Sequence, residues 1–199
     1  MKFEQAVRVP AERIGAIIGK DGQTKKGLEE KMGVQLLVDS REGLVVVRSD
    51  SVEKGDPLTA LRVVEAIGRG FSPQRALKLL EEGAALEVID LREYAGKSAN
   101  SIERIRGRII GLKGKSRRVM EELTQCHISV YGRTVAIIGD ESEVRLAAEA
   151  VRTLASGSQH KTVYNTLQRA RTKRKMERLL LWEDSSPEDS ATKFREIER

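Results

Sequence analysis

The sequence contains one pattern twice, and this internal repeat constrains the fold more than any other feature of the chain. The segment GAIIGKDGQTKKGLEEKMGVQLLV at 15–38 matches GRIIGLKGKSRRVMEELTQCHISV at 107–130, with a constant offset of 92 residues. The matched positions include a pair of isoleucines, two glycines three residues apart and a pair of glutamates. Two copies spaced by about the length of one small domain predict two similar domains in tandem rather than a solenoid.

The patterns around both copies predict the same order of elements, β-α-α-β-β-α. In the first half, strands are predicted at 3–9, 34–40 and 44–49, and helices at 10–19, 23–33 and 56–70. In the second half, strands are predicted at 85–91, 127–132 and 134–139, and helices at 99–110, 115–125 and 140–155. We therefore expect an α+β protein in which each domain packs a three-stranded antiparallel sheet on three helices.

The remaining segments join or follow these two units. We expect a first domain at 1–70, a linking helix at 71–83, a second domain at 84–158, a basic helix at 159–182 and a flexible charged tail at 183–199. The linking helix is predicted from Ser72 as a cap and Pro73 in its first turn.

The stretch IIGLKGKS at 109–116 suggests two different functions, because it ends in Gly-Lys-Ser and also contains Gly-x-x-Gly. A P-loop needs a further glycine five residues before the glycine of Gly-Lys-Ser, so that backbone N–H groups can surround a phosphate. Position 109 is Ile, and for the second Gly-Lys-Ser, at 96–98, the required position 91 is Leu. Both segments therefore fail the test for a nucleoside triphosphate site.

The second possibility, a clamp for a nucleic-acid backbone, has a direct physical basis. Glycines lack Cβ atoms, so a phosphodiester chain can approach the loop closely. The loop also presents the positive N-terminus of the following helix to phosphate. The isoleucine pairs before the loops, Ile17-Ile18 and Ile109-Ile110, can serve both the core and one wall of a groove.

Two copies of IIGxxG between helices, within β-α-α-β-β-α, resemble the type I KH-domain family over most of residues 3–155. This resemblance implies that each loop clamps about four nucleotides of single-stranded RNA or DNA. The tandem arrangement, with its linking helix and basic C-terminal helix, resembles the archaeal relatives of the Dim-two, or partner-of-Nob-one, ribosome biogenesis family. That resemblance implies a non-enzymatic assembly factor on the 3′ end region of small-subunit (pre-)rRNA, with a PIN-domain nuclease and an initiation-factor-two subunit as partners.

The two loops differ in charge, and we expect the second domain to carry most of the RNA affinity. The first loop contains an acid, Asp21, where a phosphate should lie, whereas the second loop contains none. The alternative is that the basic residues around the loops are ordinary solvated helix faces. The candidate RNA-binding residues are Ile18, Gly19, Lys20, Asp21 and Gly22 in the first domain, and Arg106, Arg108, Ile109, Ile110, Gly111, Leu112, Lys113, Gly114, Lys115, Arg117 and Arg118 in the second.

The basic C-terminal helix has two compatible interpretations. Its cations could follow RNA phosphates and steepen the salt dependence of binding; these are Arg169, Arg171, Lys173, Arg174, Lys175 and Arg178. Alternatively, an apolar face could pack on the second domain and leave the charges in water; that face would comprise Val163, Leu167, Leu179 and Leu180.

Composition restricts the remaining possibilities. A net charge of +6 and a pI of about 9.5 favour polyanionic partners. The single cysteine, Cys126, excludes an internal disulfide framework and is expected in the core, and no apolar run is long enough to span a membrane. With two histidines and no metal-ligand spacing, no metal, cofactor or catalytic residue is predicted. We expect a cytoplasmic protein that is not an enzyme.

Two other functions stay open at this point. The chain could be the RNA-binding subunit of an RNA-processing or nuclease complex, with the catalytic domain on a separate protein. It could also be a protein-interaction scaffold in which the Gly-x-x-Gly loops are degenerate and the helices outside the two domains provide docking surfaces.

Overall fold

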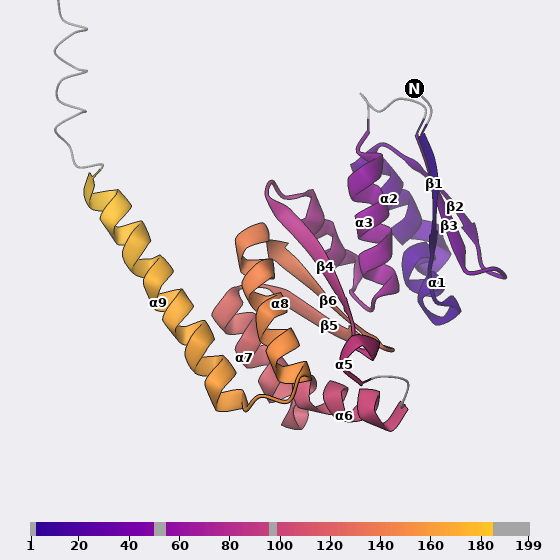
Figure 1. Cartoon of the computed structure of the whole chain (residues 1–199). Helices are drawn as coiled ribbons and strands as arrows, with labels where there is room; N and C mark the ends of the chain where they lie inside the picture. The colour runs from indigo at the N-terminus through magenta and orange to yellow at the C-terminus, as the bar shows by residue number, and fades with distance from the viewer. Residues whose placement is uncertain (1–2, 50–54, 96–98, 185–199) are drawn as a thin grey trace, which may run out of the picture.

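The computed structural model describes residues 3–49, 55–95 and 99–184 and confirms two α+β domains of the same architecture, followed by a long helix (Figure 1). The first domain comprises β1 (Phe3–Arg8), α1 (Ala11–Ile18), α2 (Gln23–Met32), β2 (Gln35–Asp39), β3 (Leu44–Ser49) and α3 (Pro57–Gly68). The second comprises β4 (Ala84–Asp90), α5 (Arg92–Ala95), α6 (Ala99–Ile110), α7 (Lys115–Thr124), β5 (His127–Tyr131), β6 (Thr134–Asp140) and α8 (Glu141–Ala155). The second Gly-Lys-Ser, at 96–98, lies outside the described residues.

Both sheets have the same topology. Their strand orders are β1-β3-β2 and β4-β6-β5, and every neighbouring pair is antiparallel. The third strand in sequence is therefore central in each sheet. The final helix of each domain begins at an aspartate: the carboxylates of Asp56 and Asp140 accept hydrogen bonds from the backbone N–H groups of Thr59 and Ser142, at 2.9 and 3.0 Å.

Two elements differ from the sequence prediction. The linking segment is one turn of α-helix, α4 (Pro73–Ala76), followed by a 3₁₀ turn, η2 (Leu77–Leu80), rather than one continuous helix. Ser72 caps it as expected, because its Oγ accepts a hydrogen bond from the N–H of Arg75 at 3.4 Å. The short helix α5 was not predicted, since four residues are too few to show a helical period.

The two domains pack directly against each other through the sheet of the second domain. Along β6, Val135 and Ile137 are buried against the helices of their own domain. The intervening Ala136 and Ile138 are buried in the core of the first domain. Because side chains alternate between the two faces of a strand, β6 contributes to both cores. Figure 1 shows the first domain lying beside this sheet.

Specific polar contacts fix the orientation of the two domains. The hydroxyl of Ser129 donates a 2.9 Å hydrogen bond to the carbonyl of Arg69, and the Tyr131 hydroxyl donates a 2.8 Å bond to the Glu12 carboxylate. The guanidinium of Arg13 lies 5.8 Å from the centre of the Tyr131 ring, which is within cation–π range. The pair of domains therefore behaves as one packed unit.

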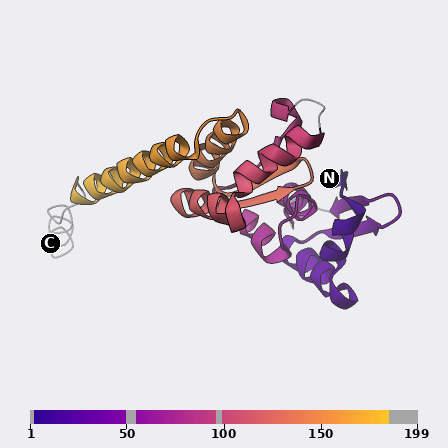
Figure 2. The same ribbon diagram turned by 90° about the horizontal axis from the view of Figure 1, so that it is seen from below.

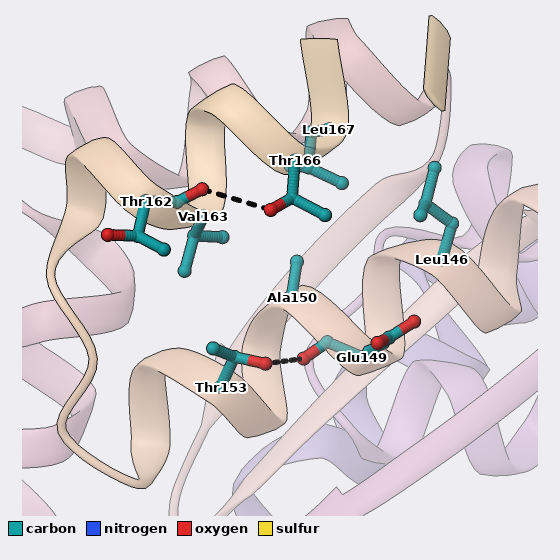
Figure 3. Close-up of a pocket in the computed structure, with 8 residues that line it drawn as sticks. All are labelled: Leu146, Glu149, Ala150, Thr153, Thr162, Val163, Thr166 and Leu167. Carbon is teal, nitrogen blue, oxygen red and sulfur yellow. Dashed lines mark hydrogen bonds between the residues drawn. The ribbon is translucent and has the colours of Figure 1, made fainter. Parts of the chain in front are cut away.

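The last helix, α9 (His160–Asp184), packs on the second domain with its first half, and Arg174 of its second half forms an ion pair with Glu143 of α8. Val163 and Leu167 are buried and lie across a pocket of about 210 Å³ from Ala150 of α8 (Figure 3). The second half extends away from the domain in both views (Figures 1 and 2). Leu179 and Leu180 are 52% and 57% exposed, so the expectation that they pack on the second domain is wrong.

The C-terminal segment was predicted as a charged tail from residue 183. Helix α9 includes residues 183 and 184, and residues 185–199 lie outside the described part of the chain. Among the described helices, none is both long and apolar enough to traverse a bilayer.

Candidate nucleic-acid interface

The two Gly-x-x-Gly loops have nearly the same backbone conformation. Each forms a 3₁₀ turn between two helices, η1 (Lys20–Gly22) in the first domain and η3 (Leu112–Gly114) in the second. The second glycines, Gly22 and Gly114, have φ of 73° and 77° and precede α2 and α7 directly. Each loop thus places the positive N-terminal end of a helix at its surface, as the sequence predicts.

The first glycine of each motif is required by the packing of the protein itself. A Cβ atom at Gly111 would lie 2.6 Å from the Cβ of Ser116, and one at Gly19 would lie 2.0 Å from the Oγ1 of Thr24. Both glycines also have a positive φ, near 70°. Thr24 and Ser116 were missed in the sequence analysis, although they occupy matching positions of the repeat. Their small side chains fill the space beside the glycine.

The second glycine of each motif faces open space. Apart from the glycine and its two chain neighbours, no atom of the described chain lies within 4 Å of a Cβ built at Gly22 or Gly114. The protein therefore leaves the backbone uncovered at this point, which allows a ligand to approach it closely. This is the position at which a phosphodiester chain would contact the loop.

The residues between the glycines are held in an unusual conformation. Lys113 has φ 50° and ψ 30°, and Asp21 has φ 50° and ψ 28°, both in the left-handed region that costs a non-glycine residue about 1 kcal/mol. Leu112 is 84% exposed, although it is a large apolar residue. Strained backbone and an uncovered apolar side chain at the same loop are typical of a binding site.

In each isoleucine pair, the first residue packs in the core and the second is available to a groove. Ile17 and Ile109 are completely buried in their domain cores. Ile18 and Ile110 are partly exposed and are the members available to a groove. Ile109 therefore cannot contact RNA directly in this conformation, and its predicted role in binding is limited to supporting the loop from below.

Arg108 also has a structural role within the second domain. Its guanidinium donates hydrogen bonds to the carbonyls of Leu154 and Ser158, at 3.4 and 2.6 Å, at the C-terminal end of α8. Arg13 does the same in the first domain, with the carbonyls of Ile67 and Phe71 at 3.0 and 2.6 Å. Both arginines thus bind carbonyl groups at and just beyond the C-terminal end of the last helix of their domain, where basic side chains commonly bind.

The other predicted cations of the second domain surround the loop in different ways. Lys113 and Lys115 are exposed. Arg118 donates a 3.1 Å hydrogen bond to the carbonyl of Lys113 and so ties α7 to the loop. The Nε atom of Arg117 lies 3.8 Å from the carboxylate of Glu121, within ion-pair distance. The buried Nε atoms of Arg106 and Arg117 have no hydrogen-bond partner among the described residues.

The first loop has fewer available charges. Lys20 and Asp21 are both exposed, so the carboxylate stands at the surface where a phosphate would lie. Lys25 forms an ion pair with Glu29 at 3.9 Å, while Lys26 is exposed. The difference in RNA affinity between the two loops stays a prediction. The charge that would cause it is the exposed carboxylate of Asp21.

Part of the basic run on α9 is occupied by contacts within the protein. Arg174 forms an ion pair with Glu143 of α8, and Lys173 lies 3.7 Å from Glu177. Arg169, Arg171 and Lys175 are exposed. The side chain of Arg178 lies outside the described part of the structure.

Catalytic chemistry has little support among the described residues. They contain no cluster of three or more His, Cys, Asp or Glu side chains that could hold a metal ion. Cys126 is buried, as expected, and burial raises the pKa of its thiol to about 11, which disfavours the reactive thiolate.

Each half of the chain matches a KH-domain model. The KH-domain model covers residues 4–82, and the model of the eukaryotic type KH domain, type I, covers residues 85–172. Together with the two Gly-x-x-Gly loops and the repeated β-α-α-β-β-α order, these matches define a tandem KH-domain protein.

Three known proteins narrow the class to one family. A KH domain-containing protein of Methanocaldococcus jannaschii is 45% identical over 94% of this chain and 83% of that protein. The pre-rRNA-processing protein PNO1 of Chaetomium thermophilum is 28% identical over 73% of this chain and 53% of its own length. A chain in the solved a/eIF2α–aDim2p–rRNA complex of Pyrococcus horikoshii is 44% identical with a TM-score of 0.81, covering 87% of this chain and 96% of that one. The chain belongs to the family of the Dim2p and PNO1 proteins, and it spans about half of the PNO1 relative.

Proposed function

We propose that this protein binds single-stranded RNA, namely the 3′ end region of small-subunit (pre-)rRNA, and acts as a non-enzymatic ribosome assembly factor in the cytoplasm. The observation that carries the proposal is the loop at 111–114, where an uncovered glycine backbone, exposed cations and the N-terminus of α7 occur together. The homologous Dim2p occurs in a complex with rRNA, which supports rRNA as the ligand.

The geometry gives each part of the loop a task. The open backbone at Gly114 admits the sugar–phosphate chain, and the positive end of α7 attracts its phosphates. Lys113 and Lys115 add two mobile charges beside this position. The partly exposed Ile110 and the exposed Leu112 offer apolar surface for the faces of bases. Gly111, packed on Ser116, holds the loop in shape.

We further propose two protein partners. The complex from Pyrococcus horikoshii contains a/eIF2α together with aDim2p, which supports an initiation-factor-two subunit as a partner. We also propose a PIN-domain nuclease as the partner that supplies the cleavage step of rRNA maturation. The protein itself would present the RNA end and leave catalysis to that partner.

Crosslinking the protein to cellular RNA, with mapping of each crosslink to a nucleotide, tests this proposal. We expect the crosslinks to cluster at the 3′ end of small-subunit rRNA and to be lost in a Leu112→Asp variant. Crosslinks spread over unrelated messenger RNAs would refute the rRNA assignment. Metal-dependent cleavage of RNA by the purified protein, abolished by the same variant, would refute the non-enzymatic role.

A further inference from the structure

A second basic site lies at the junction of the two domains. It is a pocket of about 600 Å³ whose lining includes four arginines and one glutamate. Neither Gly-x-x-Gly loop contributes to the lining. The charged residues of this interdomain pocket are Arg8, Arg41, Arg69, Arg133 and Glu42.

The four arginines of the pocket come from three turns and the end of one strand. Arg8 ends β1, Arg41 lies between β2 and β3, Arg69 follows α3, and Arg133 lies between β5 and β6. Arg69 is 3.6 Å from Glu65. Within the described ranges, no carboxylate lies within ion-pair distance of the other three arginines. A concave surface with this excess charge concentrates anions.

The contacts between the domains hold the walls of the pocket in place. The carbonyl of Arg69 accepts the hydrogen bond from Ser129, and the Glu12–Tyr131 hydrogen bond closes the same junction. A Cβ atom at Gly70, where φ is 100°, would lie 2.7 Å from the Ser129 Oγ. These contacts hold the backbone at Arg69 in place, while the side chains of Arg8, Arg41 and Arg133 are exposed and available to a ligand.

The pocket is a separate site from the second Gly-x-x-Gly loop. The carbonyl of Arg133 accepts a 2.9 Å hydrogen bond from the N–H of Leu91, just before α5, whereas the loop follows the far end of α6. Helix α6 has 12 residues and is thus about 18 Å long. A strand of RNA held at the loop would have to extend beyond the loop to reach the pocket.

We propose that the interdomain pocket binds phosphate groups of the same single-stranded RNA that the second loop clamps. Guanidinium groups suit this ligand because they bind phosphate oxygens through two parallel hydrogen bonds. RNA is favoured over an acidic protein because both walls of the pocket belong to KH domains. The first domain supplies three of the four arginines, so it contributes to RNA binding without its own acidic loop. This inference rests on the proposed function.

The test compares RNAs of two lengths on the full-length protein. A short oligouridylate fills one loop, which takes about four nucleotides, and an oligouridylate several times longer can also reach the pocket. We expect the Arg41→Glu/Arg133→Glu variant to bind the long RNA about tenfold less tightly and to lower the salt slope by about 1.4, since each lost contact to a single strand removes about 0.7. Its affinity for the short RNA should not change.

Two controls separate the possible outcomes. Arg145→Glu reverses an exposed arginine of α8 that does not line the pocket and should have no length-dependent effect. Arg41→Ala/Arg133→Ala replaces the charge-reversal variant if that one fails to fold. Unchanged long-RNA affinity in the pocket variants would overturn the inference and leave the proposed function intact. Poly-glutamate that competes with RNA for the unmodified protein but not for the pocket variants would also overturn the inference, because the pocket would then accept an acidic protein. Failure of the unmodified protein to bind either RNA would overturn the proposed function as well.

Discussion

Arg108 of α6 donates a 2.6 Å hydrogen bond to the carbonyl of Ser158, just beyond the C-terminal end of α8. A residue next to the candidate RNA-binding loop thereby connects two helices of its domain. Its charge lies one helical turn before the loop but is directed away from it, towards the protein. Proximity in sequence to the loop is therefore insufficient to make a basic residue a ligand for RNA.

The first prediction follows from this contact. Arg108→Ala removes the side-chain hydrogen bonds to the carbonyls of Leu154 and Ser158 and should lower the free energy of unfolding by about 1–3 kcal/mol. Thermal or urea unfolding measures this change. RNA affinity, measured well below the melting temperature, should stay within about twofold of the unmodified protein. A loss of affinity with no loss of stability would return Arg108 to the RNA site.

The two glycines of the second loop should respond differently to alanine. Gly111→Ala forces a Cβ into contact with Ser116 and should destabilise the protein by about 1–3 kcal/mol beyond the cost of the positive φ. Gly114→Ala meets no atom of the protein and should cost only about 1–2 kcal/mol, for its left-handed φ. RNA titrations should show Gly114→Ala weakening binding. Equal stability losses in the two variants would contradict this division of roles.

The two loops should also differ in their contribution to affinity. Asp at Leu112 or at Lys113 places a carboxylate beside the position of an RNA phosphate and should weaken binding by about tenfold or more. Lys20→Asp should have a smaller effect, because the first loop already contains Asp21. Fluorescence anisotropy with one single-stranded RNA compares the three variants directly. An equal loss of affinity in both domains would show that the loops share the binding.

Helix α9 provides a prediction on salt dependence. If the exposed Arg169, Arg171 and Lys175 contact phosphates, replacing each with Ser should reduce the slope of log K against log salt by about 0.7 per contact. Lys161→Ser, at the start of the same helix, is the matched control. An unchanged slope in the triple variant would place these charges in solvent alone. Arg174 is left intact in this experiment because its ion pair with Glu143 attaches α9 to α8.

Cys126 should make stability depend on alkaline pH. Burial raises the pKa of its thiol from the ordinary value to about 11, so the unfolded chain loses this proton at a lower pH than the folded protein does. The contribution is fully present below about pH 9 and is lost as pH rises towards 11, by at most about 3 kcal/mol. Urea unfolding across this range should show a shallower decline in Cys126→Ala. Identical pH slopes would exclude the thiol as the cause.

The repeat made the fold predictable from the sequence, because each copy supported the assignment of the other. Periodicity also identified Val163 and Leu167 as the buried side of α9. It failed for Leu179 and Leu180, since an apolar residue on a helix gives no information on whether a neighbouring element extends far enough to cover it. The domain orientation depends on complementary surfaces of two folded units, which no local pattern encodes.

The candidate loops were also found from the sequence, whereas the assignments of individual side chains needed the structure. Arg108 and Arg118 look equivalent as basic neighbours of the loop, yet one binds the end of α8 and the other the carbonyl of Lys113. The interdomain arginines are far apart in the chain, and Arg133 lies in a turn with no motif around it. Only the packing of the two domains brings it near Arg8 and Arg41.

The alternation of Ala136 and Ile138 with Val135 and Ile137 along β6 has a consequence for how the molecule can be divided. A fragment that contained the second domain alone would expose to water the face of its sheet that the first domain covers. Such a fragment is prone to aggregate, and the intact chain should melt in a single transition. The first domain therefore keeps one face of the second domain's sheet away from water. Substitutions along β6 are constrained because its side chains pack in both cores.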